Sequence, residues 1–344
     1  MIQKELDKIL DGKNLSIDES HHVINLIMSG KVSPVRIAAF LTALRQKGET
    51  SDEIIGAARA MRDKVVRINH HKEILFDNCG TGGDGAGTFN ISTTTSFVLA
   101  GCGLAVGKHG NRSVSSQCGS ADVMQALGVE ISLTPEQVGH CIDEIGIGFM
   151  FAPNLHPAMK EVVPVRKELA IRTIFNLLGP MTNPAFATHQ MIGVFDESYT
   201  SLLARAAGEL GIARVGVVYN RYGIDEITTA GPNKVSFAFN GTEEELLFEP
   251  EEYGFNKCST EDLAGGTAEE NAEITRSILR SRNNDNNPKK DTVILNAAIG
   301  LLVAGKADNI EDGIKQATAC IASGRAAAKL NLLIEVTRGF GNAQ

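Results

Sequence analysis

The chain has 344 residues, of which 41 are acidic and 33 are basic, and its formal net charge is −8. This length suits one large or two medium domains, and a hydrophobic content of 43% excludes global disorder. The acidic surplus argues against binding nucleic acid through overall charge. The longest nearly apolar run, 293–305, is too short to span a membrane, and the cysteines form no CxxC pair. With a start unlike a signal peptide, these features predict a reduced, cytoplasmic protein.

The N-terminal part of the chain carries signals for helices only. Ser16 with Glu19, and Thr50 with Glu53, form the Ser/Thr-x-x-Glu pattern of a capping box, which starts a helix. Apolar residues with a helical period follow both pairs, and no convincing strand precedes residue 74. The sequence therefore predicts a small all-helical domain at residues 1–72.

From residue 74 onward, candidate strands alternate with candidate helices. Such alternation predicts an α/β domain at residues 73–344, with a mainly parallel central sheet flanked by helices on both faces. A β-rich interval at 234–249 predicts an added antiparallel piece, and the polar stretch 281–291 predicts an exposed loop. The predicted strands are 74–80, 104–110, 148–153, 190–195 and 214–220, and the clearest helices are 91–101, 120–128 and 134–146.

The densest signal for chemistry is the glycine-rich segment 77–93, between a predicted strand and a predicted helix. Clustered glycines let the backbone approach a ligand, and a helix N-terminus favours anions. Thr88, Ser92 and Thr93 add hydroxyl donors. Asp84 could accept hydrogen bonds from sugar hydroxyls or help to hold a metal. The glycine spacing matches neither the dinucleotide fingerprint nor the P-loop, so the segment predicts a phosphate site of another kind.

A second polar loop, 107–122, also follows a predicted strand. Lys108, His109 and Arg112 place cationic or proton-carrying groups among several serines. Such a loop could wrap a phosphate or diphosphate, and the alternative is a solvated basic turn. Ser120 is also the predicted cap of the following helix.

Two arginines, Arg166 and Arg172, lie in the segment 154–185. On a straight helix a spacing of six residues corresponds to about 600°, so they would point in different directions. We expect only one of them to face a site, where its planar fork would suit a carboxylate. For Arg172 a surface or interface salt bridge is the favoured interpretation.

Adjacent carboxylates at Asp225 and Glu226 follow another predicted strand. Such a pair suits Mg²⁺ that is shared with substrate phosphates. Exposed Asp-Glu pairs are common, so the pair gains weight mainly from the two phosphate loops predicted elsewhere in the chain.

In this order, the segments resemble the anthranilate phosphoribosyltransferases over about residues 5–337. The resemblance implies a small helical domain and a large α/β domain, with the active site between them. It also implies a returning helical segment near 170–185 that joins the small domain, and a homodimer formed through that domain. The sequences that carry it are GTGGDGAGTFNIST, KHGNRSVSS, SADVMQALG, HPAMK, VRKELAIRTIFNLLGPMTNPA, GIDE, LNAAIGLLVAGKADNIEDGI and ASGRAAAKL.

The resemblance implies transfer of the phosphoribosyl group of 5-phosphoribosyl 1-diphosphate to anthranilate, an early step of tryptophan biosynthesis. Anthranilate would contact Gly80, Asn111 and Arg166, and the last two with Lys108 would have the catalytic roles. Two Mg²⁺ ions per subunit would be held by Ser92, Asp225 and Glu226. The diphosphate substrate would contact Gly80, Gly83, Asp84, Thr88, Asn90, Ile91, Ser92, Thr93, Lys108, His109, Gly110, Asn111, Arg112, Ser113, Val114, Ser115, Ser116 and Ser120.

Three further interpretations remain open at this point. A pyrimidine nucleoside phosphorylase shares the implied fold but carries a Ser-Thr-Gly-Gly-Val type of sequence at the first loop, where this chain has Gly-Thr-Gly-Gly-Asp. A non-catalytic relative that binds nucleic acid should show a basic groove and altered metal or anthranilate residues. An oxidoreductase with a dinucleotide fold lacks support from the glycine spacing. Gln125 and the pair 117–118 depart from the usual family residues, but outside the motifs.

Overall fold

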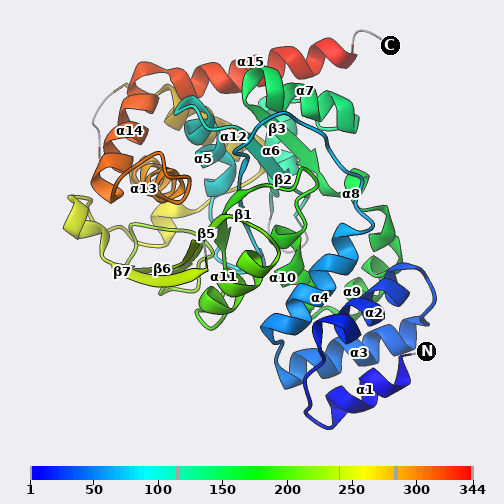
Figure 1. Ribbon diagram of the computed structural model, residues 1–344. Helices are drawn as coiled ribbons and strands as arrows, with labels where there is room; N and C mark the ends of the chain where they lie inside the picture. The colour runs from blue at the N-terminus through cyan, green and yellow to red at the C-terminus, as the bar shows by residue number, and fades with distance from the viewer. Residues whose placement is uncertain (1, 114–116, 240, 283–285, 342–344) are drawn as a thin grey trace.

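The computed structural model describes residues 2–113, 117–239, 241–282 and 286–341. Val114, Ser115 and Ser116, three of the residues expected to bind the diphosphate substrate, lie outside the described residues. Figure 1 shows a bundle of helices at the N-terminal end of the chain and a larger body with a central sheet beside it. The predicted fold class is confirmed.

Four helices form the N-terminal bundle, and their starts follow the capping signals. Ser16 accepts a hydrogen bond from the Glu19 N–H at 3.2 Å, and Thr50 accepts one from the Glu53 N–H at 3.4 Å. Both capping boxes are complete, since each glutamate also accepts from the backbone of its cap residue. The helices are α1 (Gln3–Leu10), α2 (Ile17–Met28), α3 (Pro34–Lys47) and α4 (Ser51–Arg62).

Seven strands form one sheet in the order β3-β2-β1-β4-β5-β6-β7. The first five strands are parallel, and β6 and β7 continue the sheet in antiparallel fashion, as predicted. Strand β4 is buried along its whole length, as expected for a parallel strand covered on both faces. The strands are β1 (Phe76–Gly80), β2 (Val106–Gly110), β3 (Ile147–Phe151), β4 (His189–Gly193), β5 (Arg214–Asn220), β6 (Asn233–Phe239) and β7 (Thr242–Phe248).

Helices cover both faces of the sheet (Figure 1). The first face packs against α5 (Ile91–Gly101) and α13 (Pro288–Val303), and the second packs against α11 (Tyr199–Glu209). Within the described residues, no helix is long and apolar enough to cross a membrane. The remaining long helices are α6 (Ser120–Leu127), α7 (Pro135–Ile145), α12 (Ala268–Arg280), α14 (Ile310–Ser323) and α15 (Arg325–Gly341).

The segment between β3 and β4 returns to the N-terminal bundle. Its helices contact α2, α3 and α4, and the apolar side chains of both parts form one buried cluster. That cluster continues through α11 to the second face of the sheet. The segment consists of α8 (Ala152–Leu155), the 3-10 helix η1 (Pro157–Glu161), α9 (Val163–Leu169) and α10 (Ile174–Met181).

Two short 3-10 helices, η2 (Pro250–Tyr253) and η3 (Glu261–Leu263), lie between β7 and α12. The expected loop at 281–291 ends earlier than predicted, because α13 begins at Pro288. Asn287 caps this helix by accepting hydrogen bonds from the next two backbone N–H groups beyond the proline. Proline at the first helical position, preceded by asparagine, is a helix start that we predicted as loop.

Candidate active site

The polar segments singled out from the sequence meet at one edge of the sheet. The glycine-rich segment leaves the carboxyl end of β1, Lys108 lies near the end of β2, and Asp225 follows β5. Strand β1 lies between β2 and β4. From β1 the chain adds β2 and β3 on one side of the sheet, and then β4 and β5 on the other side, so the strand order reverses at β1. In open α/β sheets, ligands bind at such a switch point, beyond the carboxyl ends of the strands.

Two buried carboxylates hold the loops of this edge together. Asp225 Oδ2 accepts a hydrogen bond from the Gly82 N–H at 2.9 Å, and Glu226 Oε1 accepts one from the Ser92 N–H at 3.0 Å. Burial, followed by the charge of Asp84, raises the pKa of Asp225 to about 7. Burial, followed by the charge of Asp225, raises the pKa of Glu226 to about 8. The edge therefore concentrates negative charge that an added cation would stabilise.

The close approach of Asp225 explains two glycines at strand ends. A Cβ atom on Gly80, at the end of β1, would collide with the Asp225 carboxylate. A Cβ on Gly193, at the end of β4, would collide with the backbone oxygen of Asp225. Glycine at these two positions lets the loop after β5 lie against both neighbouring strands.

Lys108 brings a buried cation to the N-terminus of α5. Its side chain is only 2% exposed, and Nζ donates to the Asn78 carbonyl and, at 3.3 Å, to Ser92 Oγ. The hydroxyl of Thr93 is buried without a hydrogen-bond partner among the described residues. An ammonium group, a helix N-terminus and an unused hydroxyl at one point favour an anionic ligand.

The second polar loop folds back on its own helix. Ser120 Oγ accepts from the Asn111 N–H at 3.1 Å, while Arg112 pairs with Asp122 at 2.6 Å and donates to Gln125 at 3.0 Å. The prediction that Ser120 caps the following helix is wrong by one residue, because Gly119 is the N-cap and Asp122 accepts from its N–H. Arg112 is thus held against α6 in this structure.

Two histidines form a buried pair beside Lys108. The Nε2 atoms of His109 and His156 lie 3.2 Å apart. Burial, and then the neighbouring histidine, lower the pKa of His109 well below its usual range. Burial lowers the pKa of His156 to about 4. Both rings are therefore neutral near pH 7.

The comparisons with known proteins agree with this geometry. Residues 3–65 match the family described as "Glycosyl transferase family, helical bundle domain", and residues 72–327 match "Glycosyl transferase family, a/b domain". The chain is 48% identical over 332 residues to the anthranilate phosphoribosyltransferase of Symbiobacterium thermophilum, which covers 96% of each protein. The chain belongs to the anthranilate phosphoribosyltransferase family.

Solved anthranilate phosphoribosyltransferases share the whole fold. The enzyme from Thermus thermophilus superposes with a TM-score of 0.90 at 42% identity, covering 97% of this chain and 99% of that one. The enzyme from Saccharomyces cerevisiae, in complex with PRPP and Mg, superposes with a TM-score of 0.89 at 27% identity and 98% coverage of both chains. Because that enzyme was solved with Mg, the residues of this site can be compared with what a magnesium ion needs.

The acidic edge has the chemistry that a magnesium site needs. Within the described residues, no three His, Cys, Asp or Glu side chains lie together so as to hold a metal ion on their own. Asp84 Oδ2 is buried without a hydrogen-bond partner, and Asp225 and Glu226 lie close enough to repel each other. Since Mg²⁺ is commonly bound by one or two carboxylates together with substrate phosphates, these residues fit the ion.

Several residues that the family resemblance assigns to substrate binding also make structural contacts in this chain. Thr88 forms an isolated β-bridge with the segment after η3, and Ile91 is buried in the main core. Gly110 has no room for a Cβ atom, and the Ser113 N–H donates to Asp122. For Ile91 and Gly110, only backbone groups could take part in binding.

The two arginines of the returning segment behave differently from what a straight helix predicts. Helix α9 ends at Ala170, which adopts a left-handed conformation with φ 51°, so Arg172 lies in a loop. Arg166 remains on α9, where it donates to Asn176 at 3.3 Å. Within the described residues Arg172 forms no salt bridge, and its guanidinium instead donates to the Gly83 carbonyl of the glycine-rich segment. No sequence signal pointed to this contact, since alanine is not a typical left-handed residue.

Proposed function

We propose that this chain transfers the phosphoribosyl group of 5-phosphoribosyl 1-diphosphate to the amino group of anthranilate. The products are N-(5-phosphoribosyl)anthranilate and diphosphate, and the reaction is a step of tryptophan biosynthesis. The observation that carries the proposal is the convergence of Lys108, the α5 N-terminus and two buried carboxylates at one edge of the sheet. This convergence supports binding of a diphosphate together with its metal ion.

The glycine-rich segment and the Lys108 loop bind the phosphoribosyl diphosphate in this proposal. Backbone N–H groups near Gly83 and the hydroxyl of Thr93 donate to the phosphates, and Asp84 accepts from the ribose hydroxyls or assists the metal. Lys108 and these donors neutralise the charge that develops on the departing diphosphate. The remaining contacts proposed for this substrate lie within 80–93 and 108–120.

Ser92, Asp225 and Glu226 would hold magnesium, with two ions per subunit. The ions would supply positive charge at the diphosphate leaving group. The buried carboxylates of this chain favour such charge, because burial and the charge of a neighbouring carboxylate raise their pKa values. Removal of the metal should therefore weaken the binding of the diphosphate substrate.

Anthranilate would be bound by Gly80, Asn111 and Arg166. A guanidinium fork suits its carboxylate, and Asn111 orients the ring amine toward the anomeric carbon of the ribose. The aromatic amine is a neutral nucleophile at pH 7, so the attack needs no strong base beforehand. The transition state is oxocarbenium-like, and the amine proton leaves to solvent after the bond forms.

The test follows the fluorescence of anthranilate in the presence of purified protein, phosphoribosyl diphosphate and Mg²⁺. We expect a time-dependent loss of fluorescence that stops when the metal is chelated and resumes when Mg²⁺ is restored. No loss under any of these conditions would overturn the proposal. Incubation of the protein with uridine or thymidine and phosphate tests for nucleoside phosphorylase activity, and we expect no free base to form.

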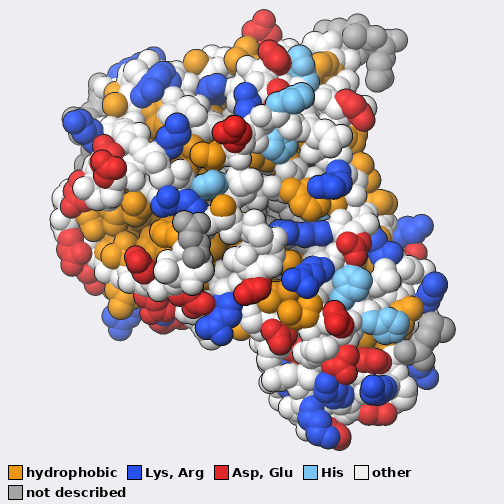
Figure 2. Space-filling model, viewed as in Figure 1, with side chains coloured by type: hydrophobic (Ala, Val, Ile, Leu, Met, Phe, Trp, Pro, Cys, Tyr) orange, Lys and Arg blue, Asp and Glu red, His pale blue; other side chains and the backbone are white. Residues whose placement is uncertain are grey.

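A non-catalytic role in binding nucleic acid has little support. Figure 2 shows basic and acidic side chains interspersed over the visible face, with acidic side chains gathered near β6 and β7. A degenerate relative would have altered metal or anthranilate residues, but this chain keeps Asn111, Arg166, Asp225 and Glu226.

A division into residues 1–72 and 73–344, with the segment near 170–185 joining the first part, is also proposed. A homodimer would form through the helical part. In support, exposed apolar side chains lie on helices that contact one another: Leu10 on α1, Val35 on α3 and Val163 on α9. The cytoplasmic location stays a prediction.

A further inference from the structure

The loop between α9 and α10 places an arginine against the glycine-rich segment. Arg172 is half-buried, and its Nη2 donates to the Gly83 carbonyl. A Cβ atom built on Gly83 would lie 3.5 Å from Arg172 Nε, so the two residues are in direct contact. Gly83 itself has a φ of 75°, a conformation that side chains disfavour.

The guanidinium group of Arg172 is fixed on its other side by an aromatic ring. Its central carbon lies 3.9 Å from the centroid of the Phe195 ring, in the loop that follows β4. Phe195 packs edge-on against Tyr199, at the start of α11, with ring centroids 5.4 Å apart. A stacked guanidinium has few alternative positions, so its hydrogen bond to Gly83 is pre-organised.

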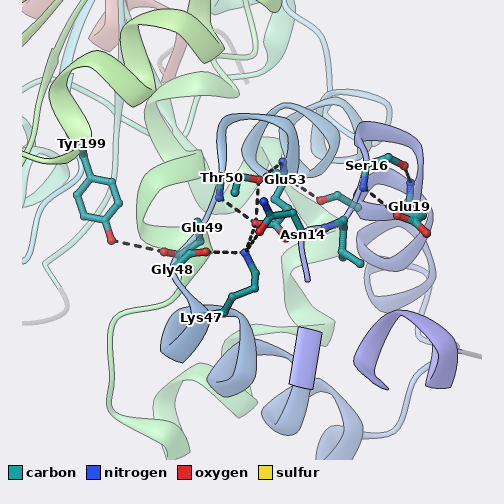
Figure 3. Close-up of polar contacts among 11 residues, drawn as sticks. Asn14, Ser16, Glu19, Lys47, Gly48, Glu49, Thr50, Glu53 and Tyr199 are labelled. Carbon is teal, nitrogen blue, oxygen red and sulfur yellow. Dashed lines mark hydrogen bonds and ion pairs between the residues drawn. The ribbon is translucent and has the colours of Figure 1, made fainter. Parts of the chain in front are cut away.

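The same arginine is tied to the N-terminal bundle. Arg45 Nη1, on α3, donates to the Arg172 carbonyl at 2.6 Å. The hydroxyl of Tyr199 lies 3.4 Å from Glu49 Oε2, between α3 and α4, as Figure 3 shows. A continuous set of contacts therefore runs from the bundle through Arg172 to Gly83.

We propose that Arg172 is a positioning residue that holds the glycine-rich segment in the conformation that binds phosphoribosyl diphosphate. The inference rests on the proposed function for the identity of that ligand. In a trans peptide the carbonyl and the following N–H point in opposite directions. By fixing the Gly83 carbonyl, Arg172 turns the Asp84 N–H away from itself and orders a segment whose glycines otherwise lose much entropy on binding.

The test compares Arg172→Met, which removes the donor, with Arg172→Gln, which keeps a donor but loses the charge. Calorimetry with phosphoribosyl diphosphate and Mg²⁺ measures the dissociation constant. We expect Arg172→Met to raise it by about tenfold or more, and Arg172→Gln to raise it by less, since a hydrogen bond from a charged donor is worth about that factor. In steady-state assays the KM for anthranilate should change by less than about twofold, because Arg172 acts on the other substrate's loop.

Arg67→Met is the matched control, because Arg67 also stacks on an aromatic ring, 4.1 Å from the Phe186 centroid, without touching the glycine-rich segment. It should leave the dissociation constant unchanged. Wild-type affinity in Arg172→Met would overturn the inference, and so would equal rises in both KM values. If the wild-type protein binds phosphoribosyl diphosphate but consumes no anthranilate, the proposed function fails. The dissociation constants of the Arg172 variants would still test the positioning role of Arg172.

Discussion

Among single residues, Arg166 tests the proposed anthranilate contact most directly. Its guanidinium lies on α9 and donates to Asn176, which leaves further donors of the fork for a carboxylate. Arg166→Ala should raise the KM for anthranilate by about 10- to 100-fold, and the KM for phosphoribosyl diphosphate by less than about twofold. Steady-state fluorescence assays with each substrate varied in turn measure both. The neighbouring exposed Lys167→Ala is the control, and equal effects on both substrates would contradict the assignment.

The buried ring of His156 predicts a pH dependence of stability. Its pKa is about 4 in the folded protein against 6.5 for an ordinary histidine, so between these values the unfolded chain binds the extra proton. The free energy of unfolding should therefore decrease as the pH falls below 6.5, by about 2 kcal/mol between pH 7 and pH 5. Urea unfolding of the wild type and of His156→Gln at both pH values measures it.

In this comparison His156→Gln should lose that part of the pH dependence. The exposed His140→Gln is the control and should keep the dependence of the wild type. An identical dependence in His156→Gln and the wild type would show that the acid sensitivity has another source.

The sequence predicts some site residues and not others for a physical reason. Lys108 lies in β2, and Asp225 and Glu226 follow β5. Because the carboxyl ends of parallel strands meet at one edge of a sheet, the local pattern predicts that these residues lie at the same edge. The contacts of His156 with His109 and of Arg172 with Gly83 depend on how a distant segment folds back. No local spacing encodes such contacts.

At the scale of elements, two capping boxes with the same sequence signature have different energetic weight. Glu53 is fully buried and accepts hydrogen bonds from the Leu15 N–H and from Lys47 Nζ, each at 2.9 Å (Figure 3). Glu19 instead pairs with Lys8 nearer the surface. Glu53→Ala should lower the free energy of unfolding by about 3–5 kcal/mol, because it leaves buried partners unsatisfied. Glu19→Ala, the matched control, should lower it by about 1 kcal/mol, and equal losses in urea unfolding would contradict this difference.

Most element boundaries follow from local signals, and the exceptions have local causes. Helix α5 and strand β5 occupy the predicted residues, since a turn or a glycine marks each end. The segment 154–185 breaks into short helices that the sequence pattern did not separate. Ala170 ends α9 in a left-handed conformation, and Pro180 lies inside α10, so neither residue acts there as propensity alone would predict.

For the whole molecule, the sequence pattern does not predict the order of the strands in the sheet. Alternating helices and strands predict a parallel sheet, but β4 pairs with β1 and not with β3. This order creates the switch point at which the phosphate-binding segments meet. The bundle is joined to the sheet through the returning segment and α11, which form one buried cluster with it. Long-range burial therefore decides both the position of the site and the attachment of the bundle.

The proposed homodimer depends on the outer surface of that bundle. Val35 on α3 is 79% exposed and Leu10 on α1 is 66% exposed. Burial of such apolar side chains by a second copy of the chain would stabilise a dimer. Val35→Asp would place a charge in that contact, so it should convert a particle of twice 36.7 kDa into one of 36.7 kDa. Leu247→Asp, on the edge strand β7 and 72% exposed in the wild type, should leave the particle unchanged. Light scattering coupled to gel filtration measures both masses. A monomeric wild type would contradict the homodimer. Dissociation by Leu247→Asp alone would show that the two copies meet at β7 and not at the bundle.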